Sequence, residues 1–219
     1  QPAPIMYDPI ETPPVVSRAQ KHTLKMNKSI INLRFPTVKL NSKYLYPLDL
    51  LDYMLGNGTQ SILYKKLVDE EKLAYSVYTS SYTPQYCNGY FEIQIEADHE
   101  NINNVIEKTL TIIESLKTKK LSTSLIKKAK KQKLAENILS IDSIEDKTSR
   151  LALSYFYSDT IDFYDKYAEN FKDITAADIQ KSAIKFFNTK KLITTIGLEE
   201  NKQLTTKNKN NTNQNNNDI

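Results

Sequence analysis

The feature that most constrains the fold of this chain is the alternation of residue types in FEIQIEA, residues 91–97. In an extended chain, successive side chains point to opposite faces, so the apolar residues share one face and the polar residues share the other. The apolar set is Phe91, Ile93, Ile95 and Ala97. The stretch therefore predicts a strand with one buried face and one open face.

The rest of the first half predicts two more strands and two helices. Residues 21–37 alternate with a phase slip, which predicts one strand with a bulge. Proline favours a first helical turn and glycine favours a helix end. The expected elements are a helix at 48–55 that starts at Pro47 and ends in LGNG (55–58), a helix through QSILYKKLVDEE capped by Thr59, and a strand at 74–82 that turns through CNG (87–89).

The second half is mostly helical by pattern. Apolar residues recur at helical spacing after Asp98, and Ser122 opens a long helix that reaches Leu139. Cap-like pairs start two further helices. These pairs are Asp142 with Glu145 and Thr175 with Asp178; another helix is expected at 162–172 and a closing strand at 191–198. This order predicts an α+β fold: a two-layer α/β sandwich with a mainly antiparallel sheet and helices packed on one face.

Both ends of the chain differ from its middle. Residues 1–20 hold five of the eight prolines and predict an extended linker. Residues 200–219 are rich in asparagine and poor in apolar residues, which predicts a disordered tail. The folded domain is therefore expected at residues 21–199, and the proline-rich start is typical of the later part of a longer protein.

Composition excludes several classes of function. The formal net charge of +4 is too small to indicate nucleic-acid binding by itself. No apolar run approaches the ~18 residues of a membrane span. Cys87 is the single cysteine, so no intramolecular disulfide is possible, and we interpret it as a small apolar residue. The compartment stays open between cytoplasm and periplasm.

The sequence carries no recognisable metal or phosphate motif, and its one basic run is weak evidence for nucleic-acid binding. His22 and His99 are far apart, and no H-x-x-E-H is present, so no zinc site is expected. LGNG (55–58) has neither the preceding strand nor the following Lys-Ser/Thr pair of a phosphate loop. The lysine run KKAKKQK (127–133) lacks interleaved aromatic residues and is best explained as a solvated helix face.

Four stretches together resemble a known family. LGNGTQSILYKKLVDEEKLAYSVYTS is followed by Gly89 and FEIQIEA, then by LSTSLIKKAKKQ and DITAADIQKSAIKFF. In order and spacing, over about residues 21–198, they resemble the repeated domain of the pitrilysin/insulinase-type zinc metallopeptidases. The chain resembles the zinc-free second, C-terminal domain of that family. The resemblance implies a two-layer sandwich that encloses peptide substrates together with a zinc-bearing N-terminal domain or partner subunit.

The resemblance also implies site residues. Zinc is expected in the partner domain, and no catalytic activity is expected from this chain alone. The second domains of the family often hold an arginine and a tyrosine seven residues apart that contact the peptide. The tyrosine falls on Tyr75, which is the one substrate-binding residue we expect here. The arginine position falls on Val68, which cannot donate hydrogen bonds.

Two functions remain open at this stage. Either the chain helps to bind peptide through Tyr75 alone, or it is an inactive scaffold subunit that kept the peptidase fold. The presence of valine at position 68 favours the scaffold. A nucleic-acid-binding module through residues 127–133 is the weaker third possibility.

Overall fold

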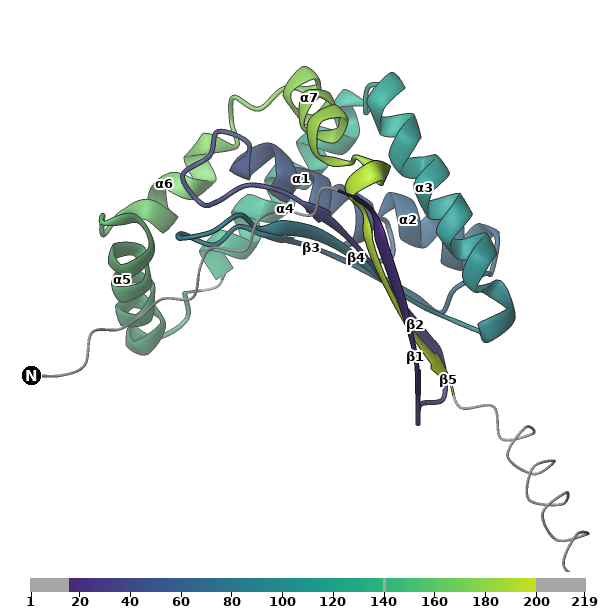
Figure 1. The fold of residues 1–219 in the computed structure, drawn as a ribbon. Helices are drawn as coiled ribbons and strands as arrows, with labels where there is room; N and C mark the ends of the chain where they lie inside the picture. Colours follow the sequence, from purple (N-terminus) through teal and green to yellow (C-terminus); the bar gives the residue numbers. More distant parts are fainter. Residues whose placement is uncertain (1–15, 140, 200–219) are drawn as a thin grey trace, which may run out of the picture.

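In the computed structural model, which describes residues 16–139 and 141–199, one curved sheet carries helices on one side (Figure 1). The sheet has five strands in the order β1-β5-β2-β4-β3. The strands are β1 (Arg18–Leu24), β2 (Ser29–Pro36), β3 (Ser76–Tyr82), β4 (Tyr90–Ala97) and β5 (Ile193–Glu199). Strand β1 pairs parallel with β5, and the other three pairings are antiparallel. The predicted α+β class and mainly antiparallel sheet are confirmed.

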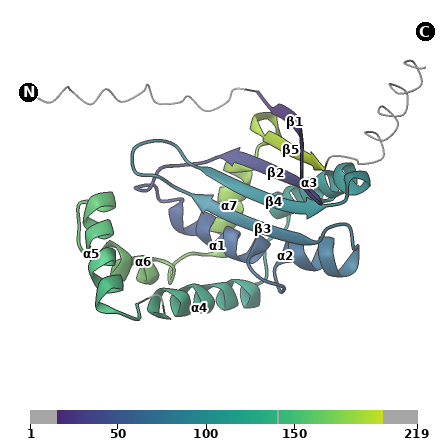
Figure 2. The same cartoon turned by 90° about the horizontal axis from the view of Figure 1, so that it is seen from below.

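The helices fill the segments between the strands. The first layer comprises α1 (Leu45–Gly56), α2 (Ile62–Tyr64) continued by a π-helical turn (Lys65–Glu70), α3 (Ile102–Thr118) and α7 (Ala176–Phe186). The others are α4 (Thr123–Leu139), α5 (Ile144–Ser158) and α6 (Phe163–Asn170). Two short 3₁₀ turns, His99–Asn101 and Thr189–Lys191, precede α3 and β5. Viewed from the open side, the strands lie in front of α1, α2 and α7, and α4 runs beyond the β3 edge (Figure 2).

The prediction of one bulged strand at 21–37 is wrong. The chain turns at residues 25–28, and the two halves become β1 and β2, separated in the sheet by β5. A phase slip looks the same in the sequence whether one residue bulges or the whole chain reverses. The outcome depends on β5, which inserts between them from about 160 residues further on and which no local pattern can reveal. Strand β1 begins at Arg18, inside the stretch that we expected to be linker, and residues 1–15 and 200–219 lie outside the described residues.

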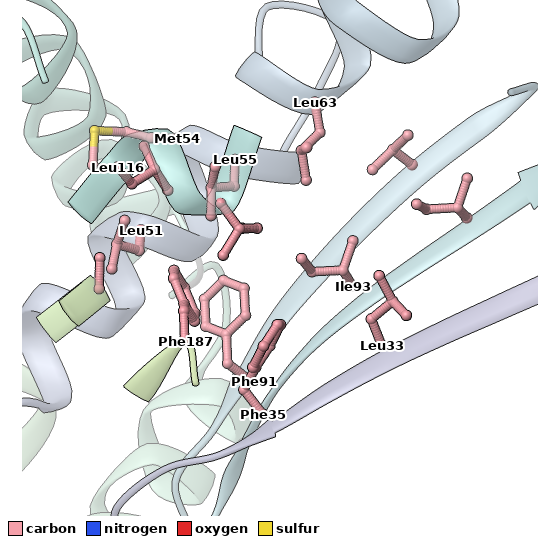
Figure 3. Packing of buried hydrophobic residues seen from close by; sticks show 14 of the residues in the cluster. Leu33, Phe35, Leu51, Met54, Leu55, Leu63, Phe91, Ile93, Leu116 and Phe187 are labelled. Carbon is pink, nitrogen blue, oxygen red and sulfur yellow. The ribbon is translucent and has the colours of Figure 1, made fainter. Parts of the chain in front are cut away.

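The core lies between the sheet and the first helical layer. The apolar face of β4 is buried as the alternation predicts, opposite the apolar side of α1 (Figure 3). Phe187 joins the two layers, because its ring centroid lies 5.2 Å from that of Phe35 and 5.0 Å from that of Phe91. Fully burying a phenylalanine side chain stabilises a fold by about 1.5–3 kcal/mol. These three rings are therefore a major part of what holds the helices on the sheet.

The N-cap residue of one helix is the predicted one, and those of two other helices differ from the prediction by one or two positions. Thr175 and Asp178 form the predicted capping box at α7. The box at α5 is made by Ser143 and Asp146, one residue later than the predicted pair, because serine accepts the backbone N–H three positions on. The residue at the start of α2 is Ser61 rather than Thr59.

Among the described residues, no helix covers the opposite face of the sheet (Figure 2). On β4 this face carries the polar residues of the alternation, Glu92, Gln94 and Glu96. The Arg34 guanidinium pairs with Glu92 across the strands at 2.7 Å, and the Ser76 hydroxyl donates to Glu96 at 3.0 Å. This open side is concave, and the helices cover the convex side (Figure 1). None of the helices in the described residues is long and apolar enough to cross a membrane.

Candidate functional site

Tyr75 stands at the end of the sheet, directly before the edge strand β3. Its backbone N–H donates to the Glu96 carbonyl at 2.8 Å, which ties Tyr75 to the C-terminal end of β4. The side chain is 51% exposed. The helix before it ends through Lys72, which takes a left-handed conformation (φ 52°) and redirects the chain into the strand. The junction between VDEEK and LAYSVYTS therefore presents Tyr75 to solvent at the edge of the sheet.

Two charged residues that flank other strands meet the Tyr75 hydroxyl. Lys28 precedes β2 and Asp98 follows β4, and the antiparallel pairing of β2 with β4 brings both to the same end of the sheet. The Lys28 ammonium donates to the Tyr75 hydroxyl oxygen and to Asp98, each at 2.7 Å. The Tyr75 hydroxyl donates to the second Asp98 oxygen at 2.8 Å. We call these three residues the Tyr75 cluster.

The electrostatics of the Tyr75 cluster keep it charged. The carboxylate of Asp98, and then the Tyr75 hydroxyl, raise the pKa of Lys28. The same ammonium, with the hydroxyl second, lowers the pKa of Asp98. The ammonium also lies 3.9 Å from the centre of the Tyr75 ring, a cation–π arrangement. Lys28 and Asp98 are therefore both ionised at neutral pH, and their charges cancel.

Counting donors shows what the cluster offers a ligand. A tyrosine hydroxyl has one hydrogen, and here Asp98 accepts it. An ammonium has three hydrogens, of which Tyr75 and Asp98 accept two. Within residues 16–139 and 141–199, the third hydrogen of Lys28 is the donor left for a group from outside.

Val68, at the position where the family often has arginine, lies in the π-helical turn before Tyr75. Its side chain is half-buried and packs against the core. Valine at this position thus contributes to packing, and the cation beside Tyr75 comes from Lys28, in the turn between β1 and β2. The sequence reasoning missed Lys28 and Asp98. One signal in the sequence could have indicated Lys28: it lies at the phase slip between the two alternating runs that become β1 and β2.

A second polar group lies on α1, where two aspartates sit inside the apolar run LDLLDYML. Asp49 accepts a hydrogen bond from the Tyr167 hydroxyl of α6. Asp52 accepts one from the Thr79 hydroxyl of β3 at 2.7 Å. Burial raises the pKa of Asp49 to about 6 and that of Asp52 to about 7. The Lys133 ammonium on α4 partly opposes both shifts.

These aspartates border a cavity of about 320 Å³ between α1, the end of β3, α4 and α6. Its lining includes the aromatic residues Tyr157, Phe163, Tyr164 and Tyr167. Each buried carboxylate has a hydroxyl partner, which is what burial of such groups requires. We interpret this group as a polar anchor that ties α4 and α6 to α1.

The described residues do not suit a zinc ion. Within 16–139 and 141–199, no group of three or more His, Cys, Asp or Glu side chains is placed to hold a metal. His22 lies on β1 opposite Gly197, and His99 lies in the 3₁₀ turn before α3. Cys87 is exposed in the connection between β3 and β4. Asp98, the carboxylate of the Tyr75 cluster, is already neutralised by Lys28.

The fold and the site define a class: a helix-backed α+β domain with an open polar sheet face. The model of the family described as Peptidase M16 inactive domain matches residues 2–133, which is more than half of the chain. The chain belongs to this family, and it is a non-catalytic domain of the C-terminal type. The resemblance to zinc metallopeptidases read from the sequence is thereby confirmed.

Solved structures share the fold. A protease from Helicobacter pylori has a TM-score of 0.75 at 20% identity over 90% of this chain and 47% of its own. A peptidase M16 inactive domain from Pseudomonas fluorescens has 0.76 at 14% identity, over 88% of this chain and 46% of its own. Complex III2 from Candida albicans contains a chain with 0.70 at 14% identity, over 83% and 45%. This chain spans about half the length of these proteins. No curated protein matches it.

Proposed function

We propose that this chain is the zinc-free half of a two-part zinc peptidase, in which a zinc-bearing half cleaves peptides inside a shared chamber. The observation that carries the proposal is the concave sheet face, which no helix covers in the described residues (Figures 1 and 2). A sheet of this kind normally buries one face and leaves the other to solvent or to a partner. Here it would form one wall of the chamber.

The relatives support a partner of similar size. The solved proteins from H. pylori and P. fluorescens are about twice as long as the part that this chain matches. In such an assembly, the zinc of the partner half would activate a water for attack on the peptide bond. This chain would contribute enclosure and exclusion of water from the cleavage site.

Helix α5 supplies a surface for that partner. It lies at one end of the molecule, beyond the sheet, and extends toward the open side (Figure 1). One stripe of the helix is apolar and solvent-exposed: Ile144 is 80% exposed, Leu151 47% and Tyr155 63%. Exposed apolar stripes of this kind are typical of protein interfaces. We propose that the zinc-bearing half packs against this stripe.

The Tyr75 cluster is the peptide-contacting group in this proposal. Its free donor is the third ammonium hydrogen of Lys28, which can reach a peptide carbonyl oxygen. Tyr75 holds that ammonium in place through its hydroxyl and its ring. Tyr75 therefore acts as the platform, and Lys28 takes over the role of the absent arginine at position 68.

Peptide kinetics in the assembled two-half protein test this assignment. Lys28→Gln is expected to raise KM about 3- to 10-fold, because one hydrogen bond to a charged donor is worth roughly 1.5–3 kcal/mol at most and solvent exposure reduces it. Tyr75→Phe keeps the ring under the ammonium and is expected to change KM less. Lys25→Gln, which removes a lysine from the same turn outside the Tyr75 cluster, is the matched control. A larger loss in Tyr75→Phe than in Lys28→Gln would show that the phenol is the donor.

The alternative function is an inactive scaffold subunit that kept the peptidase fold. Two observations favour it: the packing role of Val68 and the similarity to a chain of Complex III2 from C. albicans. The presence of an H-x-x-E-H motif encoded with this chain, in the same polypeptide or in a partner, separates the two. Its presence supports the peptidase half, and its absence from both supports the scaffold.

A further inference from the structure

Asparagine followed directly by glycine occurs twice in this chain, at Asn57-Gly58 and at Asn88-Gly89. The first pair lies between α1 and α2, and the second lies between β3 and β4. Such a pair has a chemistry of its own, because the backbone nitrogen after an asparagine can attack the carbon of the side-chain amide. Glycine hinders this attack least, since it has no Cβ and allows a wide range of backbone angles.

The reaction needs no catalyst, and its atoms balance with water alone. The glycine nitrogen loses its proton and bonds to the asparagine Cγ, the bond from Cγ to the amide nitrogen breaks, and ammonia leaves. The product of this step is a cyclic succinimide. Water then opens the ring at either carbonyl, which gives aspartate or isoaspartate. The nucleophile must therefore be a backbone N–H that is free to lose its proton and to turn toward the side chain.

The fold blocks this attack at Asn88-Gly89. The Gly89 N–H donates to the Val38 carbonyl at 3.1 Å, and the Gly89 carbonyl accepts from the Thr37 N–H at 2.8 Å. Gly89 is buried, and a Cβ atom on it would stand 1.8 Å from the Tyr82 carbonyl oxygen. Its nitrogen is thus paired and its surroundings are crowded. Attack there requires that the connection between β3 and β4 first opens locally.

The fold leaves the nucleophile free at Asn57-Gly58. Both residues are exposed. Within residues 16–139 and 141–199, neither the Gly58 N–H nor the Asn57 side chain makes a hydrogen bond. Helix α1 ends at Gly56, so its backbone ladder does not take up the Gly58 N–H. The Gly58 carbonyl accepts from the Ser61 N–H at 3.1 Å, but this bond leaves the Gly58 nitrogen unpaired.

The backbone at Gly58 also has room to turn. Asn57 is extended, with φ −91° and ψ 106°, and Gly58 has a φ of 79°. Apart from the chain neighbours of Gly58, no described atom lies within 4 Å of the position of its absent Cβ. We propose that Asn57 of the folded chain converts spontaneously to aspartate and isoaspartate through a succinimide with Gly58, and that the fold protects Asn88 from the same reaction.

The conversion changes the junction between α1 and α2. It replaces a neutral amide by a carboxylate, which lowers the formal net charge of +4 by one unit. Isoaspartate also adds one atom to the main chain ahead of Ser61, which is buried at the start of α2. The exposed residues 57–60 have to take up this extra length. The reaction belongs to the chain itself and does not depend on the proposed peptidase role.

Peptide mapping by mass spectrometry tests the proposal on the 219-residue wild-type chain, incubated in mildly alkaline buffer at physiological temperature. In the folded chain, Asn57 should convert at least about tenfold faster than Asn88, because the connection around Asn88 must open first. In concentrated urea, which unfolds the chain and removes the hydrogen bond to Val38, the two asparagines should convert at similar rates. The rate at Asn57 should rise with pH, since the nitrogen attacks in its deprotonated form.

Asn57→Gln is the matched variant, because glutamine would have to close a larger ring and its position is exposed. It should lose the conversion at position 57 and leave Asn88 unchanged. The wild-type comparison does not depend on this variant. The proposal is overturned if folded wild-type chain keeps the Asn57 amide over a time in which the unfolded chain loses it. It is also overturned if Asn88 converts as fast as Asn57 in the folded chain.

Discussion

Gly56 at the end of α1 lies directly against Thr79 of β3. A Cβ atom on Gly56 would stand 2.5 Å from the Thr79 side chain and 2.7 Å from its backbone nitrogen, closer than such contacts occur. Gly56→Ala must therefore push α1 away from β3. We expect the free energy of unfolding to fall by about 1–3 kcal/mol, as in other overpacked cores. Urea denaturation followed by circular dichroism measures this.

Gly58, two residues on, provides the control. Its φ of 79° favours glycine, but open space surrounds the position of its absent Cβ. Gly58→Ala should cost only the conformational term, about 1–2 kcal/mol, and Gly58→Asn less, because asparagine tolerates this region. If Gly56→Asn were as mild as Gly58→Asn, the close approach of α1 to β3 would be wrong.

Thr175 caps α7, a helix whose Ala183 and Phe186 pack in the core. The hydroxyl accepts from the Asp178 N–H at 3.3 Å, and the Asp178 carboxylate accepts from the backbone N–H of Thr175 at 3.0 Å. Thr175→Ala is expected to lower the free energy of unfolding by about 1 kcal/mol, and Thr175→Ser by much less. Equal losses in both variants would show that the methyl group, and not the cap, is what counts.

The aspartate pair on α1 predicts a pH dependence of stability. Burial raises the pKa of Asp49 to about 6 and that of Asp52 to about 7, above the ordinary value of 3.8. Between about pH 4 and pH 7, the folded chain holds protons that the unfolded chain has lost. The stabilisation of the folded chain by these two protonated carboxyls is therefore fully present below about pH 4. It disappears as the pH rises through 6 to 7. We expect the free energy of unfolding to fall by about 2–4 kcal/mol between pH 5 and pH 8.

Asp52→Asn isolates the source of that slope. The amide oxygen can still accept from Thr79, but it does not titrate. The neighbouring charges, Lys133 and Glu136 on α4, stay in place, as do the Asp49 carboxyl and the Tyr167 hydroxyl. Carboxylates such as Asp98 and Asp146 have lowered pKa values and therefore titrate below this pH window. The variant should lose roughly two thirds of the slope, because the pKa of Asp52 lies about one unit above that of Asp49. An unchanged slope would place its origin elsewhere.

The sequence predicts the elements of this fold well where one face is buried. The alternation at 91–97 and the stripe on α3 report burial directly, because half of each element contacts the core. Strand β1 is exposed along its whole length, so its pattern carries no such information. Its separation from β2 and its parallel pairing with β5 are properties of the sheet, not of the local chain.

The candidate site was predictable only in part. Tyr75 could be proposed because a resemblance in sequence surrounds it. Lys28 and Asp98 are 47 and 23 residues from it along the chain and meet it through strand register. The cation was sought at Val68, where a linear motif places it, but in this chain a different turn supplies it. A contact made through strand register between distant residues leaves no mark in a local motif.

We propose that the metal and the cleavage chemistry belong to a partner that this chain covers. The most direct test is zinc content and peptide cleavage, measured by metal analysis and a fluorogenic peptide. Both are measured on the chain alone and on the chain assembled with the zinc-bearing half. We expect no stoichiometric zinc and no cleavage for the chain alone, and one zinc per complex with cleavage when both halves are present. One zinc per isolated chain, together with peptide cleavage by it, would show that this chain holds the metal and the chemistry itself.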